Sequence, residues 1–354
     1  MNFSHEEGHP PVPEGLFSQG DKNTAQGKDA IVVYGGPGNQ ARPGIPMAAG
    51  LVLCALGGLS AGLVSPIACL LVGFGALAAG AGRSRWLHAA VIAGTLVLSG
   101  MGGAFFGAES VPDALVAALV GLASALLVEK GRMTPGAACL VALAAAAAHI
   151  GIAEAYALAG QTTLADSLAG LVSENTQLFE AAGVDPGTLA VVQRVVGIIW
   201  PAVFSTLAAL ELLCACAGAA LAAGRLRDRV AEVPDFGLFD LPLWVVAIFV
   251  AAVVGLAVWF TQPSLATDAL LMVAGNALLT VRYALAAQGI AVLVWHLRSR
   301  KTPALAFVLA VAFAAYLEAQ FIVMSFVGLL DIWANLRRLP RGAQESSQDG
   351  AKQD

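Results

Sequence analysis

Long apolar runs separated by short polar turns extend from about residue 44 to residue 336. The apolar positions do not alternate with polar ones, as they would in the strands of an outer-membrane barrel. A helix satisfies its backbone hydrogen bonds within its own segment, and a helix of about 20 apolar residues spans the hydrocarbon core. The pattern therefore predicts an all-α fold, a polytopic transmembrane helical bundle with about 9–10 membrane segments.

The stretch from Asp268 to Arg300 is the most informative of these runs. At a rise of about 1.5 Å per residue, one helix of this length exceeds a bilayer core of about 30 Å, so it is expected to cross with a tilt. Asn276, Arg282 and Gln288 interrupt its apolar composition. A guanidinium near mid-depth costs at least about 2.5–3.5 kcal/mol, so Arg282 requires a partner on another helix.

Prolines divide two other apolar blocks. Pro66 disfavours helix at the residue before it and removes a backbone donor, so the first block is predicted to form two short segments, about 46–64 and 66–82. The predicted span over about 191–223 is likewise interrupted at Pro201.

Residues 160–190 form the one sizeable polar insertion. Thr163 followed by Asp166 predicts a capped helix start, and leucines at helical spacing predict an amphipathic helix. Asp185 and Pro186 are suited to cap and begin the next helix. A helix lying on the membrane surface is the favoured interpretation, and a lid over a cavity is the alternative.

The distribution of lysine and arginine predicts the topology. The turns near residues 109–113, 160–190 and 262–268 hold acids and a single nearby arginine, Arg194. By the positive-inside rule the basic turns are cytoplasmic, which places the amino terminus in the cytoplasm and the insertion outside it. The expected location is the bacterial inner membrane. The basic turns lie at residues 83–85, 130–132, 225–229 and 298–301.

The last apolar run, residues 304–330, has two interpretations. A single crossing would place Arg337, Arg338 and Arg341 outside the cytoplasm. Two short helices folded back near residues 317–320 would return these arginines to the cytoplasm, although each helix would be shorter than usual. We favour the second interpretation because it agrees with the positive-inside rule.

Composition supports the membrane assignment. The chain is 58% hydrophobic and 12% charged, whereas a soluble domain carries about 25% charged residues. A net charge of −5 argues against a nucleic-acid partner. We interpret residues 1–43 and 337–354 as polar cytoplasmic tails, the first of them disordered, around a transmembrane domain over 44–336. The five cysteines lie in apolar runs and are interpreted as packing residues, with no metal or cofactor expected.

Four ionisable residues lie near the middle of predicted helices: His149, Glu211, Arg282 and Glu318. In the functional interpretation they form a central pocket in which Arg282 faces an anionic group while Glu211 and His149 line the site or relay protons. In the structural interpretation, which is slightly favoured, Arg282 and Glu211 form an ion pair that ties two helices together. Glu318 competes for Arg282 only if the last run is a single span.

Two amides belong to the same candidate polar site. Gln288 is suited to donate hydrogen bonds into the cavity, although a bond between helices is its commoner role. Asn276 stands about 120° from Arg282 around the helix, so the two residues need not share a partner.

A polar motif follows the last apolar run. Asp331 and Asn335 share one helix face and are followed by Arg337 and Arg338. The spacing favours a helix end anchored at the cytoplasmic interface, in which Asp331 pairs with Arg338 or with an arginine from another loop. A docking site for a soluble partner is the weaker alternative.

The carboxy-terminal third resembles the YybS-like family of bacterial polytopic membrane proteins, whose function is unknown. The resemblance rests on Pro234-Asp-Phe-Gly-Leu-Phe-Asp-Leu-Pro242, Asn276, Ala287-Gln288-Gly289, Gly328-Leu-Leu-Asp331 and Asn335-Leu-Arg337. It implies similarity to the substrate-binding membrane subunits of energy-coupling-factor vitamin transporters. Neither a substrate nor a catalytic residue comes with it.

No hydrolase, metalloprotease or intramembrane-protease signature occurs in the sequence, so an enzyme is not expected. The leading hypothesis is an inner-membrane protein that binds or moves a small solute. The sequence contains no ATPase motif, so active transport would require an ATPase or other membrane partner, or an ion gradient. The alternative is a membrane scaffold or assembly factor that recruits protein partners, with Arg282–Glu211 as a structural ion pair.

Overall fold

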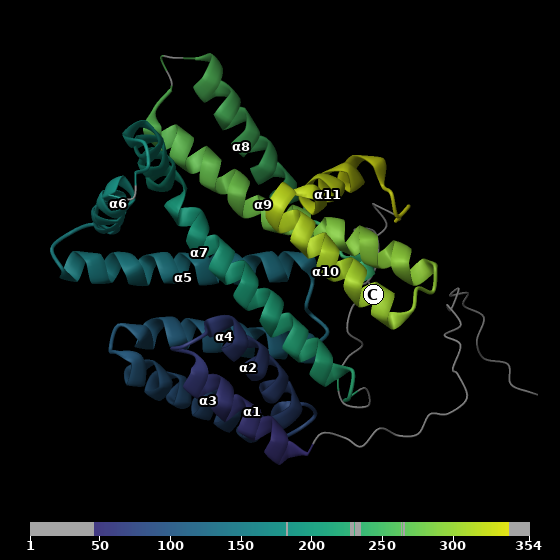
Figure 1. Cartoon of the computed structure of the whole chain (residues 1–354). Coiled ribbons are helices and arrows are strands. Elements are labelled where there is room, and N and C mark those ends of the chain that lie inside the picture. The colour runs from purple at the N-terminus through teal and green to yellow at the C-terminus, as the bar shows by residue number, and fades with distance from the viewer. Residues whose placement is uncertain are drawn as a thin grey trace, which may run out of the picture. The chain divides into compact units, whose positions relative to one another are not determined.

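The computed structural model shows a bundle of helices (Figure 1). It describes residues 46–181, 183–226, 230, 235–262, 264 and 266–339, without the side chains of residues 177–181. Within that part, eleven α-helices and one 3-10 turn follow one another: α1 (Met47–Ser60), α2 (Ser65–Gly80), α3 (Arg85–Phe106), α4 (Ser110–Glu129), α5 (Pro135–Ala159), α6 (Leu164–Ala181), α7 (Pro186–Ala223), η1 (Phe236–Leu238), α8 (Leu243–Thr261), α9 (Asp268–Ser299), α10 (Ala304–Phe321) and α11 (Val323–Ala334).

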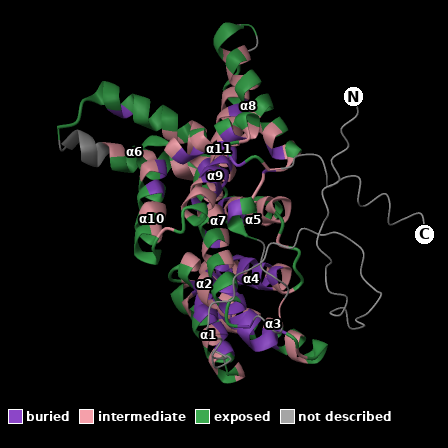
Figure 2. Ribbon diagram, turned by 90° about the vertical axis from the view of Figure 1, so that its right-hand side faces the viewer, coloured by how far each residue is buried: buried purple, intermediate pink, exposed green. Residues whose placement is uncertain are grey.

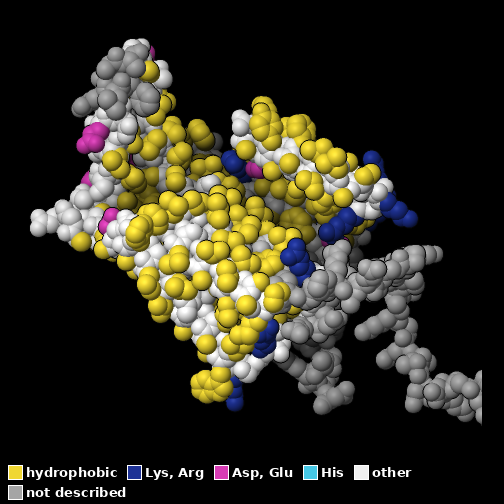
Figure 3. Space-filling model, turned by 60° about the horizontal axis from the view of Figure 1, so that its bottom comes forward, with side chains coloured by type: hydrophobic (Ala, Val, Ile, Leu, Met, Phe, Trp, Pro, Cys, Tyr) yellow, Lys and Arg dark blue, Asp and Glu magenta, His cyan; other side chains and the backbone are white. Residues whose placement is uncertain are grey.

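The prediction of a polytopic helical bundle is confirmed. Seven of the described helices, α3, α4, α5, α7, α8, α9 and α10, are long and apolar enough to cross a membrane, and α1, α2 and α11 are shorter apolar helices. The predicted tails over residues 1–43 and beyond residue 339 lie outside the described residues. In Figure 3 apolar side chains cover most of the visible face, with basic side chains toward the right and bottom and acidic ones toward the left.

Close contacts between small residues hold the first helices together. A side chain on Gly75 of α2 would lie 2.7 Å from the carbonyl oxygen of Gly50 in α1, and one on Gly218 of α7 would lie 2.1 Å from that of Leu70. Such approaches suit a bilayer, where van der Waals packing replaces the hydrophobic effect between helices. Figure 2 shows buried residues concentrated where α1, α2 and α4 lie. The predicted division of the first block is confirmed, with Pro66 in the first turn of α2.

The polar insertion forms α6, and its predicted start is confirmed. The Asp166 amide donates to Thr163 Oγ1 at 3.1 Å, and that hydroxyl donates to Asp166 Oδ2 at 2.7 Å. Glu154 of α5 also accepts from the Leu164 amide at 3.0 Å, so a residue of the preceding helix completes the cap. Asp185 caps α7 as predicted, accepting from the Thr188 amide at 2.9 Å.

The last apolar run forms two helices, as favoured from the sequence. The break lies at Ile322, which adopts a left-handed conformation with φ of 60°, and not at residues 317–320. Helix α11 then folds back onto α9 through two glycines. A side chain on Gly289 would lie 1.9 Å from the Met324 carbonyl oxygen, and one on Gly328 would lie 2.0 Å from that of Leu285. Only residues without a side chain permit this approach.

Asn276 of α9 bonds to the backbone of α7 beside Pro201. Its Oδ1 accepts from the Ala202 amide at 2.9 Å, and its Nδ2 donates to the Ile198 carbonyl at 2.6 Å. A proline within a helix removes one backbone donor and displaces the carbonyl one turn before it. Asn276 therefore compensates for the proline inside α7, and its predicted independence from the partner of Arg282 is confirmed.

We expect Asn276→Leu to lower the free energy of unfolding by about 1–3 kcal/mol, because it leaves buried backbone groups of α7 without a partner. Asn175→Leu is the matched control, since Asn175 is exposed on α6 and its side chain donates to the Leu171 carbonyl of the preceding turn. Unfolding of the two purified variants in the same detergent measures the difference. Equal stabilities would show that Asn276 does not support the α7 backbone.

Candidate functional site

The predicted Arg282–Glu211 ion pair is wrong. Arg282 Nε lies 3.2 Å from Glu318 Oε1, whereas Glu211 Oε2 lies 3.1 Å from Nε2 of His149. The break at Ile322 lets α11 fold onto α9, and this arrangement brings the end of α10 to the level of Arg282. The expectation that Glu318 reaches Arg282 only from a single long span is therefore also wrong.

Glu318 has a structural role at the corner between α10 and α11. It is 8% exposed, and its carboxylate accepts from the Ser325 amide at 2.9 Å and from the Ser325 hydroxyl at 2.7 Å. The Ser325 amide belongs to the first turn of α11, where backbone donors lack helical acceptors and a negative charge is favourable. Glu318 thus caps α11 and balances the charge of Arg282.

Polar side chains follow the contact between α7 and α9. Thr280 donates to Ser205 Oγ at 2.9 Å, and the hydroxyls of Thr206 and Tyr283 share a hydrogen bond. The guanidinium of Arg282 lies 5.3 Å from the centre of the Tyr283 ring. We call this set the α7–α9 seam; its members are Ser205, Thr206, Asn276, Thr280, Arg282 and Tyr283.

A second polar group, the Asp113–His149–Glu211 chain, joins α4, α5 and α7. His149 Nδ1 lies 2.8 Å from Asp113 Oδ1, and its Nε2 lies 3.1 Å from Glu211 Oε2. The Glu211 and His149 side chains are 0% and 2% exposed, whereas that of Asp113 is 54% exposed. Glu211 Oε1 is buried and has no hydrogen-bond partner among the described residues.

The sequence pattern predicts His149 and Glu211 as polar-site residues, but it does not predict Asp113. Asp113 stands in an acidic turn, where a carboxylate is ordinarily solvated and draws no attention. Its position in the first turn of α4, at the start of a predicted span, was the only signal. The predicted single pocket containing His149, Glu211, Arg282 and Glu318 is wrong, because the structure pairs these residues in two separate groups.

Gln288 and the carboxy-terminal motif form a third group, which we call the Arg337 cluster. Arg337 Nη2 lies 2.7 Å from Asp331 Oδ2, and Nη1 donates to the carbonyl oxygens of Gly237 and Phe239 at 2.8 and 2.7 Å. The side chains of Arg337 and Asp331 are both 0% exposed. Asp331 therefore pairs with Arg337, and the predicted pairing with Arg338 is wrong.

Gln288 completes this cluster and does not point into a cavity with Arg282. Its Oε1 accepts from the Leu241 amide at 2.8 Å, and its Nε2 donates to Asp240 Oδ1 at 3.1 Å and Asp331 Oδ2 at 3.0 Å. Gln288 therefore forms a hydrogen bond between helices, from α9 to Asp331 of α11, which is the commoner role of a glutamine within a membrane helix. The predicted start of the polar tail at residue 337 is wrong, because Arg337 is buried inside the bundle.

Asn335 and Arg338 have lesser roles in the motif. Asn335 adopts φ of 44°, ends α11, and exchanges two side-chain hydrogen bonds with the backbone of Leu339, at 2.8 and 2.9 Å. Arg338 is exposed. The motif therefore anchors the helix end, as predicted, through Asp331, Asn335 and Arg337.

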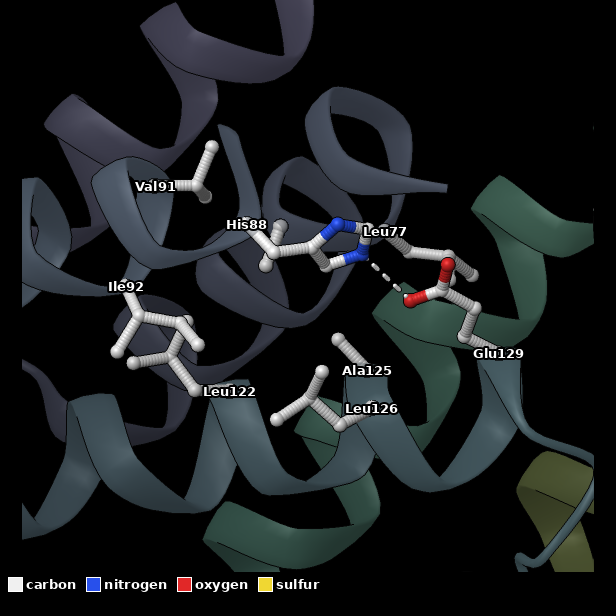
Figure 4. Close-up of a pocket in the computed structure, with 9 residues that line it drawn as sticks. Leu77, His88, Val91, Ile92, Leu122, Ala125, Leu126 and Glu129 are labelled. Carbon is white, nitrogen blue, oxygen red and sulfur yellow. Dashed lines mark hydrogen bonds and ion pairs between the residues drawn. The ribbon is translucent and has the colours of Figure 1, made fainter. Parts of the chain in front are cut away.

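A small apolar cavity lies between α2, α3 and α4 (Figure 4). Leu77 and Leu122 line it, and His88 Nε2 lies 2.9 Å from Glu129 Oε2 at its edge. Its volume of about 10 Å³ corresponds to one water molecule. The cavity is too small for a solute, and none of its lining residues belongs to the α7–α9 seam.

Comparison with protein-family models, with curated proteins and with solved structures gave no match. Membership of the YybS-like family therefore stays a prediction. The motifs that carry the resemblance do meet in space: Gln288 and Asp331 join the Arg337 cluster, and Gly289 packs against Gly328. The candidate spans make the chain an integral, multi-pass membrane protein.

Proposed function

We propose that the protein binds or moves a small solute within the bacterial inner membrane, in the manner of a transporter substrate-binding subunit. The observation that carries the proposal is the polar α7–α9 seam, which lies between the proline inside α7 and the break between α10 and α11. Helix α7 is continuous through Pro201, so the predicted interruption there is wrong, but the proline leaves backbone groups at one end of the seam to which Asn276 bonds. The break at Ile322 lies near the other end, where Arg282 meets Glu318.

A proline inside one helix and a break between two others support a transport role because they place polar backbone and side-chain groups at membrane depth. In many secondary transporters, proline- or glycine-interrupted helices form the substrate site near the midplane. Here the exposed face of α7 carries Thr206 in place of an apolar residue, and Thr206 bonds to Tyr283 of α9. Hydroxyls on membrane helices commonly bond one helix to another, and in our proposal this pair also lines the path of a polar solute.

Arg282 supplies the seam with a cation whose charge is already balanced. Its side chain is 25% exposed, its Nε faces Glu318, and its guanidinium stacks near Tyr283. A solute with hydrogen-bonding groups therefore fits the seam better than a strongly anionic one, which would compete with the well-held Glu318 for the same cation. A membrane partner or an ion gradient would supply the energy for active transport.

The test compares small molecules that co-purify with the wild type and with Thr206→Val/Tyr283→Phe, extracted from nanodiscs and identified by mass spectrometry. Loss of the two hydroxyl groups, each able to bond to a solute, is expected to lower the occupancy of the bound solute by about tenfold or more. Arg194→Ala is the matched control on α7, because Arg194 is 68% exposed and 3.9 Å from Asp268. A stable protein partner in place of any small molecule, across several expression conditions, would overturn the proposal and favour a scaffold.

A further inference from the structure

The Asp113–His149–Glu211 chain connects a fully buried carboxylate to an exposed one through a histidine. Contacts of 2.8 and 3.1 Å join the three side chains, and they come from three different helices. At 1.5 Å per residue, Asp113, His149 and Glu211 lie about 24, 21 and 18 Å from the ends of their helices at Glu129, Pro135 and Ala223, respectively. The chain therefore leads inward from one end of the bundle.

We propose that the Asp113–His149–Glu211 chain is a proton-binding and relay site, with Glu211 as the group that is loaded and unloaded. The proton site itself does not depend on the proposed function. The statement that the proton is the coupling ion for solute movement deepens the proposed function and rests on it. The chain belongs to α4, α5 and α7, and shares helix α7 with the α7–α9 seam.

Counting protons shows why the site is suited to exchange. Each nitrogen of His149 faces a carboxylate oxygen, so two protons are required to avoid a lone pair opposite a lone pair. With both protons on the imidazole, or with one shifted from Nε2 to Glu211 Oε2, the three side chains together carry one net negative charge. A third proton makes the group neutral, and a neutral group is the one that a low-dielectric interior favours.

Glu211 Oε1 is the atom with room for the third proton. It is buried without a hydrogen-bond partner among the described residues, an arrangement that is costly for a carboxylate and mild for a carboxylic acid. The proton on Nε2 first moves to Glu211, whose carboxyl group turns to place it on Oε1. Rotation of the now neutral imidazole turns its remaining N–H toward Glu211, and its free nitrogen takes a proton that Asp113 has bound from outside. The three protons then sit on Glu211 and on the two imidazole nitrogens, and Asp113 is again a carboxylate.

Among the described residues, His149 is the one basic group paired with Glu211. Cys69 of α2 and Cys214 of α7 interact electrostatically with Glu211. The Cys69 thiol donates a hydrogen bond to the Ala117 carbonyl at 3.2 Å. From α9, which also packs against α7, Arg282 is engaged with Glu318. On α5, Glu154 accepts from the backbone of Leu164. Protonation is therefore the available means of neutralising Glu211.

Infrared difference spectroscopy of the full-length protein in lipid, recorded during a pH titration, tests the proposal. The carbonyl band of a protonated carboxylic acid is expected to titrate in the wild type and to be lost in Glu211→Gln. Glu154→Gln is the matched control and is expected to retain the band, because Glu154 caps α6 and does not contact His149.

Two further variants give opposite shifts that a structural hydrogen bond would not produce. Asp113→Asn removes a negative neighbour, so a neutral Glu211 is less favoured and the midpoint of the band moves to lower pH. His149→Gln removes a positive neighbour, so the midpoint moves to higher pH. Asp113 is half-exposed, so its variant remains informative even where Glu211→Gln does not fold.

A titrating band that persists in Glu211→Gln, or midpoints that do not move in Asp113→Asn and His149→Gln, would overturn the relay. The spectroscopy needs no solute, so its outcome is independent of the test of the proposed function. If Glu211 titrates but no solute co-purifies with the protein, the proton site is supported and the transport proposal is contradicted. If a solute co-purifies but Glu211 does not titrate, the transport proposal is supported and the proton site is contradicted.

Discussion

Arg337→Met is expected to lower the free energy of unfolding by about 3–5 kcal/mol, the usual cost of breaking a buried ion pair by removing one partner. Arg337 has a side chain that is 0% exposed and bonds to Asp331 and to the carbonyls of Gly237 and Phe239. Methionine has a similar length but supplies no donor. The substitution therefore removes the counter-charge of a buried carboxylate and the donor to two backbone oxygens.

Arg338→Met is the matched control for this prediction. Arg338 is the next residue along the chain and is exposed, so its substitution is expected to change stability by no more than about 0.5 kcal/mol. Adding Asp331→Asn to Arg337→Met should recover part of the loss, because it removes the unbalanced charge. Unfolding in detergent or bicelles measures all three variants. Equal losses for Arg337→Met and Arg338→Met would contradict the cluster.

Arg282→Leu and Glu318→Gln are each expected to cost about 3–5 kcal/mol, whereas the double variant should cost much less than their sum. Each single change leaves one charge without its partner, at 3.2 Å in the native protein. The double variant removes both charges, and the glutamine oxygen can still accept from the Ser325 amide. The coupling energy from this cycle measures the ion pair within the bilayer.

The charge-reversed pair Arg282→Glu/Glu318→Arg separates the two roles of Glu318. It restores an ion pair, but an arginine at position 318 cannot accept from the Ser325 amide and places a positive charge at the start of α11. Rescue is therefore expected to be incomplete. Full rescue would show that Glu318 does not cap α11. Arg194→Leu, at an exposed pair 3.9 Å apart, is the control with an expected effect of about 0.5 kcal/mol or less.

The lengths of the apolar runs and the residues that cap or break helices were sufficient to predict most helices. Pro66 and the caps at Thr163 and Asp185 depend on interactions with the nearest few residues, and the structure has them where the sequence placed them. The division of the last apolar run followed from the positive charges beyond it. Its position at Ile322 did not, because no proline or glycine marks a left-handed residue there.

Partners across the bundle were the part that sequence reasoning missed. Arg282 was recognised as a charge in need of a partner, but Glu211 and Glu318 both stood near the middle of their helices. The choice between them depends on how α9 faces its neighbours. Asp113 was missed, and the burial of Arg337 was not predicted, for a related reason: residues in turns and tails are ordinarily solvated, and only the packing of other helices changes their surroundings.

The sequence by itself determined that this is a multi-pass helical membrane protein, where most helices begin and end, and which side chains are too polar for their depth. These properties follow from local hydrophobicity and capping, which act over a few residues. The tertiary structure alone decided that Arg282 meets Glu318, that Glu211 joins His149 and Asp113, and that Arg337 is internal. Those pairings depend on the rotation of each helix about its axis, which is set by close packing of small residues between helices.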